Sequence, residues 1–182
     1  ANGINIVSGP SLTAGGLFNL STGTFLQYGP ANPNVSVNNF TMGGSLNVAS
    51  GTFVCTDLTN SGVFGIVNLS GGSITLNQDP GQFPDLRASL DISGGTMTIN
   101  GGIGTSWWAW GGTPTHLNMT GGVLDFNTAG VSVFDPYNIT TAISGGIIRT
   151  SGVLSVTHPN FTPTGGTAEL YGNATASVRT EN

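Results

Sequence analysis

The sequence predicts an all-β protein: a right-handed parallel β-helix of about seven coils that forms a single domain over residues 1–182. Three observations predict this fold. A Gly-Gly pair recurs every 20–28 residues, and the flanking residues alternate between apolar and polar. Each pair also lies in a similar short sequence motif, as in a solenoid protein. The seven pairs are Gly15-Gly16, Gly43-Gly44, Gly71-Gly72, Gly94-Gly95, Gly121-Gly122, Gly145-Gly146 and Gly165-Gly166.

Each repeat is expected to form a strand, a glycine corner and a second strand. Counted from the first glycine of a pair, the third and fifth residues are almost always apolar and the fourth is polar. This is the pattern of a strand with one buried face. Equivalent strands in a β-helix stack about 4.8 Å apart. We therefore expect Leu76, Ile99 and Phe126 to occupy one interior column.

An antiparallel β-sandwich is the alternative fold, because it also has short strands and glycine-rich turns. A sandwich would not place the same corner at the same point of every repeat, so the β-helix is favoured. Further Ser-Gly words predict a second corner in some repeats, at Ser50-Gly51, Ser61-Gly62 and Ser151-Gly152. No segment predicts an α-helix. The single cysteine, Cys55, alternates with apolar neighbours and is expected to be a buried thiol.

Two segments differ from the repeat. Residues 1–10 are expected to form an N-terminal strand that serves as an assembly arm. Residues 101–116 are expected to form an inserted loop, which contains all three tryptophans, Trp107, Trp108 and Trp110. Clustered tryptophans stack on sugar rings or pack against protein. The loop is therefore predicted either to bind a glycan or to pack within the chain or against a like subunit.

Charge and hydropathy exclude several classes of protein. The chain carries 3 Lys+Arg and 8 Asp+Glu, for a net charge of -5, so it lacks the basic face that binds nucleic acid. No apolar run approaches the roughly 20 residues of a membrane-spanning helix, and no membrane insertion is expected. No signal peptide is visible at the start of the sequence, as in a mature chain from which a leader has been removed.

The repeat words resemble those of a known group of proteins. The segments LDISGGTMTI, LNMTGGVLDF and AISGGIIRTSGVLSV resemble the right-handed β-helix repeats of bacterial surface proteins, notably autotransporter passenger domains and pectin-lyase-like proteins. The resemblance covers nearly the whole chain. It implies a β-helix at the cell surface or outside the cell. It does not choose an activity, because that group includes adhesins, lyases, glycosidases and inert stalks.

A catalytic site in a β-helix should appear as a column of acids, because equivalent positions of neighbouring coils are neighbours in space. One outward column contains a single acid and reads Asn68, Asp91, Asn118, Ala142 and Thr162. A second column places Arg149 between Asp125 and Glu169, which predicts an ion-pair ladder on an outer face rather than an acid pair. We therefore expect no catalytic residue, no metal site, no cofactor and no enzymatic activity.

Sequons for N-glycosylation, Asn-x-Ser/Thr, are frequent. If the protein is secreted, they are candidate attachment sites. A structural explanation competes, because residues i and i+2 of a strand share a face and a polar face repeats polar residues at that spacing. The candidate residues are Asn19, Asn34, Asn39, Asn68, Asn118, Asn138, Asn160 and Asn173.

These observations favour a non-enzymatic extracellular structural or adhesive protein that assembles end to end into a surface fibre or filament. Solenoids normally have polar caps, and neither end of this sequence contains one. A head-to-tail homopolymer would cover the open ends. Alternatively, the chain is one segment of a longer protein. The apolar residues expected at the assembly surfaces are Ile4, Ile6, Val7, Leu170 and Val178.

Two other functions are weighed against the structural one. The first is a polysaccharide-binding or polysaccharide-degrading module, with surface glycans as partners and the tryptophan loop as its main support. The second is ice binding, which needs a flat, regular array of threonines. Only Thr75 and Thr98 align in the column that tests it, so ice binding ranks below both other functions.

Overall fold

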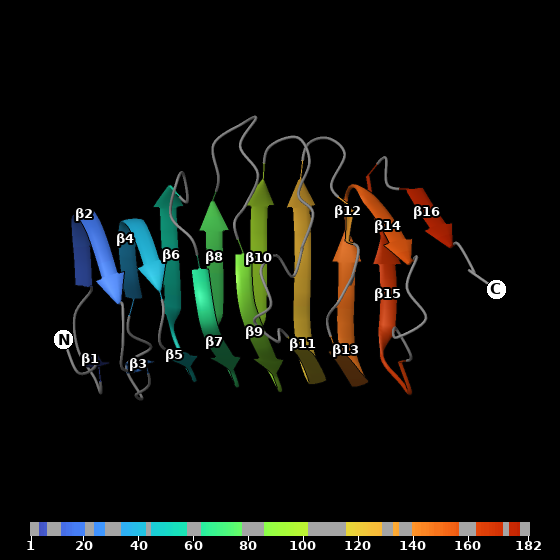
Figure 1. Cartoon of the computed structure of the whole chain (residues 1–182), viewed down its shortest axis with the longest axis horizontal. Helices are drawn as coiled ribbons and strands as arrows, with labels where there is room; N and C mark the ends of the chain where they lie inside the picture. Colours follow the sequence, from blue (N-terminus) through green and yellow to red (C-terminus); the bar gives the residue numbers. More distant parts are fainter. Residues whose placement is uncertain are drawn as a thin grey trace.

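The computed structural model describes residues 4–6, 12–20, 24–27, 34–42, 45–57, 63–77, 86–101, 116–128, 133–134, 140–156, 163–172 and 175–178. Side chains are described for a smaller set, residues 34–36, 45–55, 65–77, 89–100, 116–127, 140–152 and 163–172. The described residues form strands, corners and no helix. The strands lie in a row that starts with β1 and β2 and ends with β15 and β16 (Figure 1). All strand pairs are parallel, which confirms the predicted parallel β-helix and excludes the antiparallel sandwich.

The first side of the coil, side one, is a column of parallel strands that pair in sequence order. Each strand pairs with the equivalent strand of the next coil. At the start of the chain one coil takes about 21 residues, so Ile4 aligns with Phe25 and Phe25 with Leu46. Side one contains β1 (Ile4–Ile6), β3 (Thr24–Gln27), β5 (Ser45–Val48), β7 (Val63–Leu69), β9 (Leu86–Ile92) and the first parts of β11 (His116–Thr128) and β13 (Thr140–Thr150).

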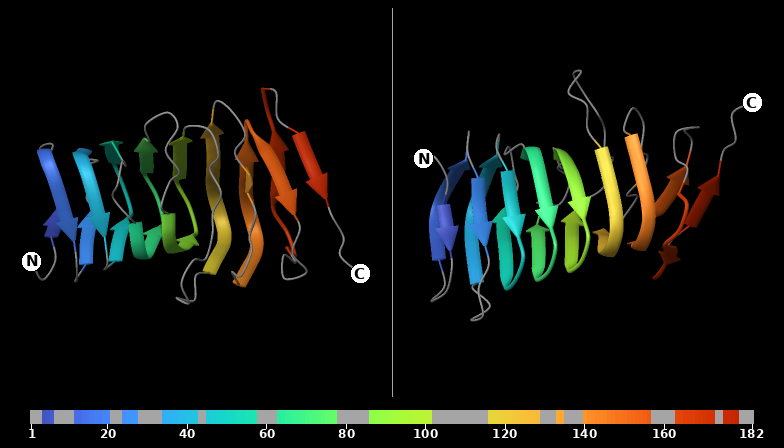
Figure 2. Two further views of the ribbon diagram at one scale, coloured as in Figure 1. Left: turned by 45° about the horizontal axis from the view of Figure 1, so that its top comes forward. Right: turned by 90° about the horizontal axis from the view of Figure 1, so that it is seen from below.

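A second column, side two, follows each glycine corner. Strands β11 and β13 continue around the corner from side one into side two. Both sides run along the molecule and are joined at the row of corners (Figure 2). Side two contains β2 (Leu12–Leu20), β4 (Asn34–Met42), β6 (Thr52–Asp57), β8 (Ser73–Asn77), β10 (Thr96–Gly101), the second parts of β11 and β13, and β15 (Thr167–Leu170).

The third side is a separate sheet of three parallel strands, β12 (Val133–Phe134), β14 (Val153–Val156) and β16 (Thr175–Val178). About three coils therefore have all three sides within the described residues. The predicted count of about seven full coils is corrected accordingly, although sides one and two continue through more rungs. The right-handed twist of the coil stays a prediction, in keeping with the crossovers that parallel strands nearly always make.

The core lies between sides one and two, where alternate residues point inward. The column of Leu76, Ile99 and Phe126 is confirmed: Ile99 pairs with both others, and each of the three is at most 2% exposed. Cys55 is a fully buried free thiol, as expected. Side one supplies the facing column, Leu46, Val67, Leu90 and Leu117, which are also buried.

The corners depend on glycine for two separate reasons. The second glycine of a pair has a positive φ, +72° at Gly95, which residues with a side chain rarely adopt. It also lies against the corner of the preceding coil, so that a Cβ on Gly95 would be 2.6 Å from the carbonyl oxygen of Gly72. The corner carbonyls in turn accept hydrogen bonds from the next coil, as when Gly95 accepts from the N–H of Val123 at 2.9 Å.

The predicted register of the first two repeats is wrong. Leu12, predicted to precede a corner at Gly15-Gly16, instead aligns through Val35 and Phe53 with Ile74, which follows the corner. Leu46 stacks with Val67 on side one, one strand earlier than predicted. The corner of that coil is instead formed at Gly51, whose φ is +72° and whose carbonyl accepts from the N–H of Ser73. A corner therefore requires one positive-φ glycine, and a Gly-Gly pair alone does not identify it.

Successive coils differ in length while their rungs stay in register. The corner glycines with positive φ on successive coils are Gly51, Gly72, Gly95, Gly122, Gly146 and Gly166. Neighbouring members of this series are 21, 23, 27, 24 and 20 residues apart. Strands β8 and β10 still pair residue for residue, as do β10 and β11, so the differences in length are absorbed outside the corners and side two.

Candidate functional site

The last described rung of side two exposes positions that are buried in the preceding coils wherever their side chains are described. Strand β15 pairs with β13 so that Ala168 aligns with Ile148, and Leu170 with Thr150. Ile148 and Thr150 are buried, at 7% and 1% exposed. All four residues of β15 are exposed, and Leu170 is 43% exposed. Inward-facing positions of the coil are therefore accessible at this end of the described structure.

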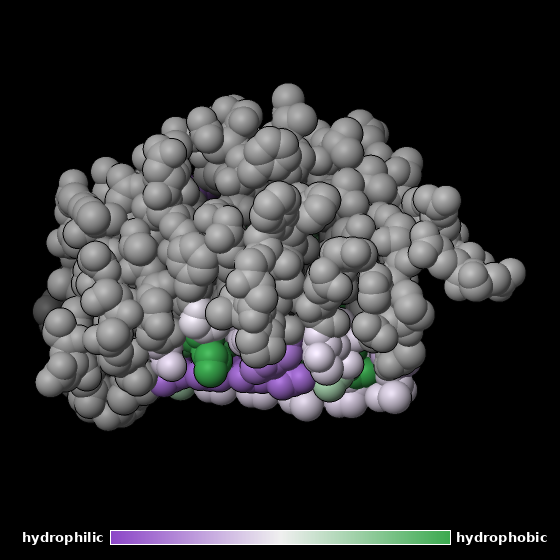
Figure 3. Space-filling view, in the orientation of Figure 1, coloured by the Kyte–Doolittle hydropathy of each residue, from purple (hydrophilic) through white to green (hydrophobic). Residues whose placement is uncertain are grey.

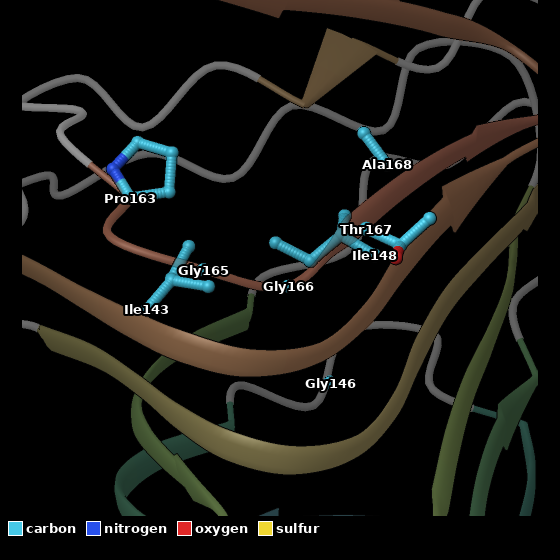
Figure 4. A pocket seen from close by; sticks show the side chains of 8 residues that line it. All are labelled: Ile143, Gly146, Ile148, Pro163, Gly165, Gly166, Thr167 and Ala168. Atoms are coloured by element: carbon cyan, nitrogen blue, oxygen red, sulfur yellow. The ribbon is translucent and has the colours of Figure 1, made fainter.

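A small apolar pocket lies beside the exposed strand. It has a volume of about 90 Å³, which is room for more than one water molecule, and its lining is mostly aliphatic. Ile143 and Pro163 lie on one side of it, and Ile148, Thr167 and Ala168 on the other (Figure 4). We call this pocket, together with β15, the terminal surface.

A polar cluster joins the last three rungs beside the terminal surface. Arg149 Nη2 lies 2.8 Å from Asp125 Oδ2, and the hydroxyl of Tyr171 donates to Asp125 Oδ1 at 2.8 Å. The guanidinium carbon of Arg149 lies 5.8 Å from the centre of the Tyr171 ring, within the range of a cation–π contact. The cluster therefore connects three successive coils through side chains as well as through the sheet.

The predicted position of Arg149 between Asp125 and Glu169 is confirmed by the strand register. The expected exposure is wrong for one member of the ladder, since Asp125 is only 5% exposed. Its carboxylate is covered because Arg149 and Tyr171 both contact it. The hydrogen bond to Asp125 raises the pKa of Arg149 above its ordinary value, so the guanidinium stays charged at every physiological pH.

Tyr171 gives the cluster a testable dependence on alkaline pH. Its burial, and then its hydrogen bond to Asp125, raise the pKa of its hydroxyl above the ordinary value. A raised folded-state pKa means that the contribution to stability is present below the unfolded-state pKa and is lost as pH rises through the folded-state pKa. We expect the unfolding midpoint to fall over this alkaline interval, and Tyr171→Phe to reduce that fall. The measurement is urea unfolding from pH 8 upward; equal pH dependence in both proteins would contradict it.

The outer face of side one contains side-chain ladders. Asn68 Nδ2 donates to Asn47 Oδ1 at 2.5 Å, and Asn118 Nδ2 donates to Asp91 Oδ1 at 2.7 Å. His116 Nε2 lies 3.2 Å from the same oxygen of Asp91. A second ladder on side two consists of Asn77, Asn100 and Asn127, with hydrogen bonds of 2.8 and 2.9 Å.

The sequons are distributed over both outer faces. Asn68 and Asn118 belong to the ladder on side one, where each donates through Nδ2, the atom that would carry a glycan. Asn34 is exposed and accepts a hydrogen bond from the Thr52 hydroxyl at 2.6 Å. Asn19 lies in β2 and Asn39 in β4, and Asn138, Asn160 and Asn173 lie outside the described residues. Glycosylation of these residues stays a prediction.

Several other predicted residues lie at the margins of the described structure. Trp107, Trp108, Trp110 and Val7 lie outside the described residues; the inserted loop is described only at its ends, by Gly101 and His116. Three predicted assembly residues lie in the outermost described strands. They are Ile4 and Ile6 in β1 and Val178 in β16.

Comparisons with known proteins do not assign a family: no protein-family model, no curated protein and no solved structure matches the chain. Among the described residues, no group of three His, Cys, Asp or Glu side chains could hold a metal ion. In the same residues, no helix has the length and apolar character needed to cross a membrane.

Proposed function

We propose that the protein is a non-enzymatic structural or adhesive protein outside the cell, and that its copies assemble end to end. The terminal surface is the observation that carries this proposal. It combines an exposed edge strand, an apolar pocket and the exposed side chain of Leu170. Edge strands and exposed core positions favour association because pairing satisfies backbone hydrogen bonds and removes apolar area from water.

A second copy of the chain is the occupant that fits this surface. Each coil already packs against another coil of similar cross-section, so the first rungs of one copy offer the shape that the last rung of another lacks. Strand β1 pairs only with β3, and β15 only with β13, among the described residues. A contact between unlike ends does not close on itself and therefore propagates into a filament. Low charge, 6% of residues, limits repulsion between copies.

The assembly is tested by placing a charge on the terminal surface. Leu170→Lys should convert polymers into monomers, because the ammonium group would be buried without a partner at the junction. The matched control is Thr140→Lys, which adds the same charge at an exposed position of β13 outside the pocket lining. Light scattering and negative-stain images of both variants and of the unmodified protein give the result.

Deletion of residues 1–10 tests the opposite end. It should also abolish polymers while leaving a β-rich, soluble protein. Unmodified protein that stays monomeric at high concentration would contradict the proposal, as would polymers that persist in Leu170→Lys. In either case the polysaccharide-binding function would take precedence.

A further inference from the structure

We propose that a shallow groove on the outer face of side one binds a neutral polysaccharide. The groove has a volume of about 200 Å³ and crosses three successive coils. Each coil contributes two outward-facing polar residues that are two positions apart. The six residues, here called the side-one groove, are Asn68, Ser70, Asp91, Ser93, Asn118 and Thr120.

The groove presents the same kind of chemistry at every coil. One column carries an amide or carboxylate, and the parallel column carries a hydroxyl, at strand spacings of about 4.8 Å. Hydrophilic residues, with apolar residues among them, are visible along the lower edge of the molecule (Figure 3). A polymer with a repeating pattern of hydroxyl groups can contact such a series at several coils, whereas a single small molecule contacts only one or two.

The polar groups are held in fixed orientations by contacts that run along the coil. Asn68 is held by Asn47, and Asp91 by both Asn118 and His116, at distances of 2.5–3.2 Å. A group that is already ordered loses little conformational entropy on binding, so a groove with fixed polar groups gains affinity from modest contacts. Exposed hydroxyls of Ser70, Ser93 and Thr120 lie beside the ladder.

Charge selects between neutral and acidic ligands. The groove contains one carboxylate, Asp91, and no cationic lysine or arginine, and the whole chain carries a net charge of -5. An acidic polysaccharide would therefore be repelled, because a like charge would be brought beside a carboxylate that has no ammonium or guanidinium partner. A sugar hydroxyl can instead donate to Asp91 and accept from an amide N–H. This matches a neutral glycan.

The test blocks the groove without removing its ladder. Ser93→Tyr places a bulky side chain at the middle coil, and Thr98→Tyr makes the same change on the outward face of side two of that coil. Affinity electrophoresis of the full chain uses soluble neutral polysaccharides, namely laminarin, hydroxyethylcellulose and galactomannan, with polygalacturonate as the acidic probe. We expect retardation by at least one neutral polysaccharide. Ser93→Tyr should weaken that binding at least tenfold, and Thr98→Tyr should leave it unchanged.

A second variant tests the chemistry of recognition. Asp91→Asn keeps an acceptor for Asn118 but removes the charge, so it should weaken binding of the neutral glycan while lowering discrimination against polygalacturonate. Three results would overturn the inference: no retardation by any neutral polysaccharide, equal binding by Ser93→Tyr and the unmodified protein, or loss of binding only when Trp107, Trp108 and Trp110 are replaced by alanine. The measurement is independent of end-to-end assembly when repeated on monomeric Leu170→Lys.

Discussion

Gly95→Ala is expected to destabilise the coil by about 2–5 kcal/mol. About 1–2 kcal/mol of this comes from placing alanine at a positive φ, +72° at this corner. A further 1–3 kcal/mol, roughly, comes from overpacking, because the new Cβ would lie 2.6 Å from the Gly72 carbonyl oxygen and 2.8 Å from the Gly71 carbonyl carbon. Both neighbours are backbone atoms of the preceding coil and cannot move aside without breaking the stack.

Gly172→Ala is the matched control for the corner. Gly172 also has a positive φ, +63°, but the nearest atom to its added Cβ is the Ser151 Cβ at 4.0 Å. Gly172→Ala should therefore lower the free energy of unfolding only by the cost of the positive φ, about 1–2 kcal/mol. Urea unfolding followed by circular dichroism measures both variants. Equal losses in the two would show that close stacking of the corners adds nothing to stability.

Phe126→Ala is expected to cost about 3–5 kcal/mol, the range for deleting a large buried aromatic side chain. Phe126 is 2% exposed and aligns with Ile99 in the preceding coil and Thr150 in the following one. Neither neighbour is large enough to fill the space that the ring leaves, and both are held by strand pairing on each side. The cost therefore includes a cavity as well as lost apolar burial.

Asn127→Ala, at the adjacent position, is the control. Asn127 is exposed, and its side chain donates the ladder hydrogen bond to Asn100. Loss of this hydrogen bond should lower the free energy of unfolding by only about 0.5–1.5 kcal/mol. Chemical denaturation of the two variants under one set of conditions gives the comparison. A loss at Phe126 no larger than that at Asn127 would mean that the inner column is not packed as described.

Local sequence predicted the later coils well because two independent signals coincide there. Alternation marks the strands on both sides of the corner, and a Gly-Gly pair marks the corner itself. In these coils both glycines are required: a Cβ on Gly94 would lie 2.5 Å from the Ser70 carbonyl oxygen, and Gly95 needs its positive φ. Because alternation and the Gly-Gly pair agree, they predicted the strand register and the interior column of these coils. They also predicted the order of Asp125, Arg149 and Glu169.

The same reasoning failed in the first coils because the Gly-Gly pairs there do not mark the corner between sides one and two. At Ser50-Gly51 the first position accepts a serine, so this corner has one glycine. The Ser-Gly pattern predicted a corner there, but only as a second one after a corner expected at Gly43-Gly44. At Gly15-Gly16 a pair lies on side two, after the position of the corner, where the pairing of β2 with β4 shifts register. Glycine composition alone does not distinguish a corner from a bulge, since both favour the residue.

The terminal surface was only partly predictable. Leu170 was expected at an assembly surface from its place near the end of the repeats, but the pocket depends on Pro163 and Ala168 leaving space beside Ile143, which strand alternation does not reveal. Tyr171 carried a usable signal, because it follows Glu169 at a spacing of two and so shares its outward face. Its contact with Asp125, two coils away, required the fold.

Unequal spacing between corners has a consequence for how such a protein can diversify. Coils of 20 to 27 residues keep the same strand register, so gain or loss of residues between side two of one coil and side one of the next is separated from the packing that holds the rungs together. Insertions and deletions at these positions can therefore change the surface of each coil without disturbing the strand pairing. For the engineer, the same property makes the chain a scaffold for display: foreign peptides inserted between rungs would be presented at regular intervals along one rigid axis.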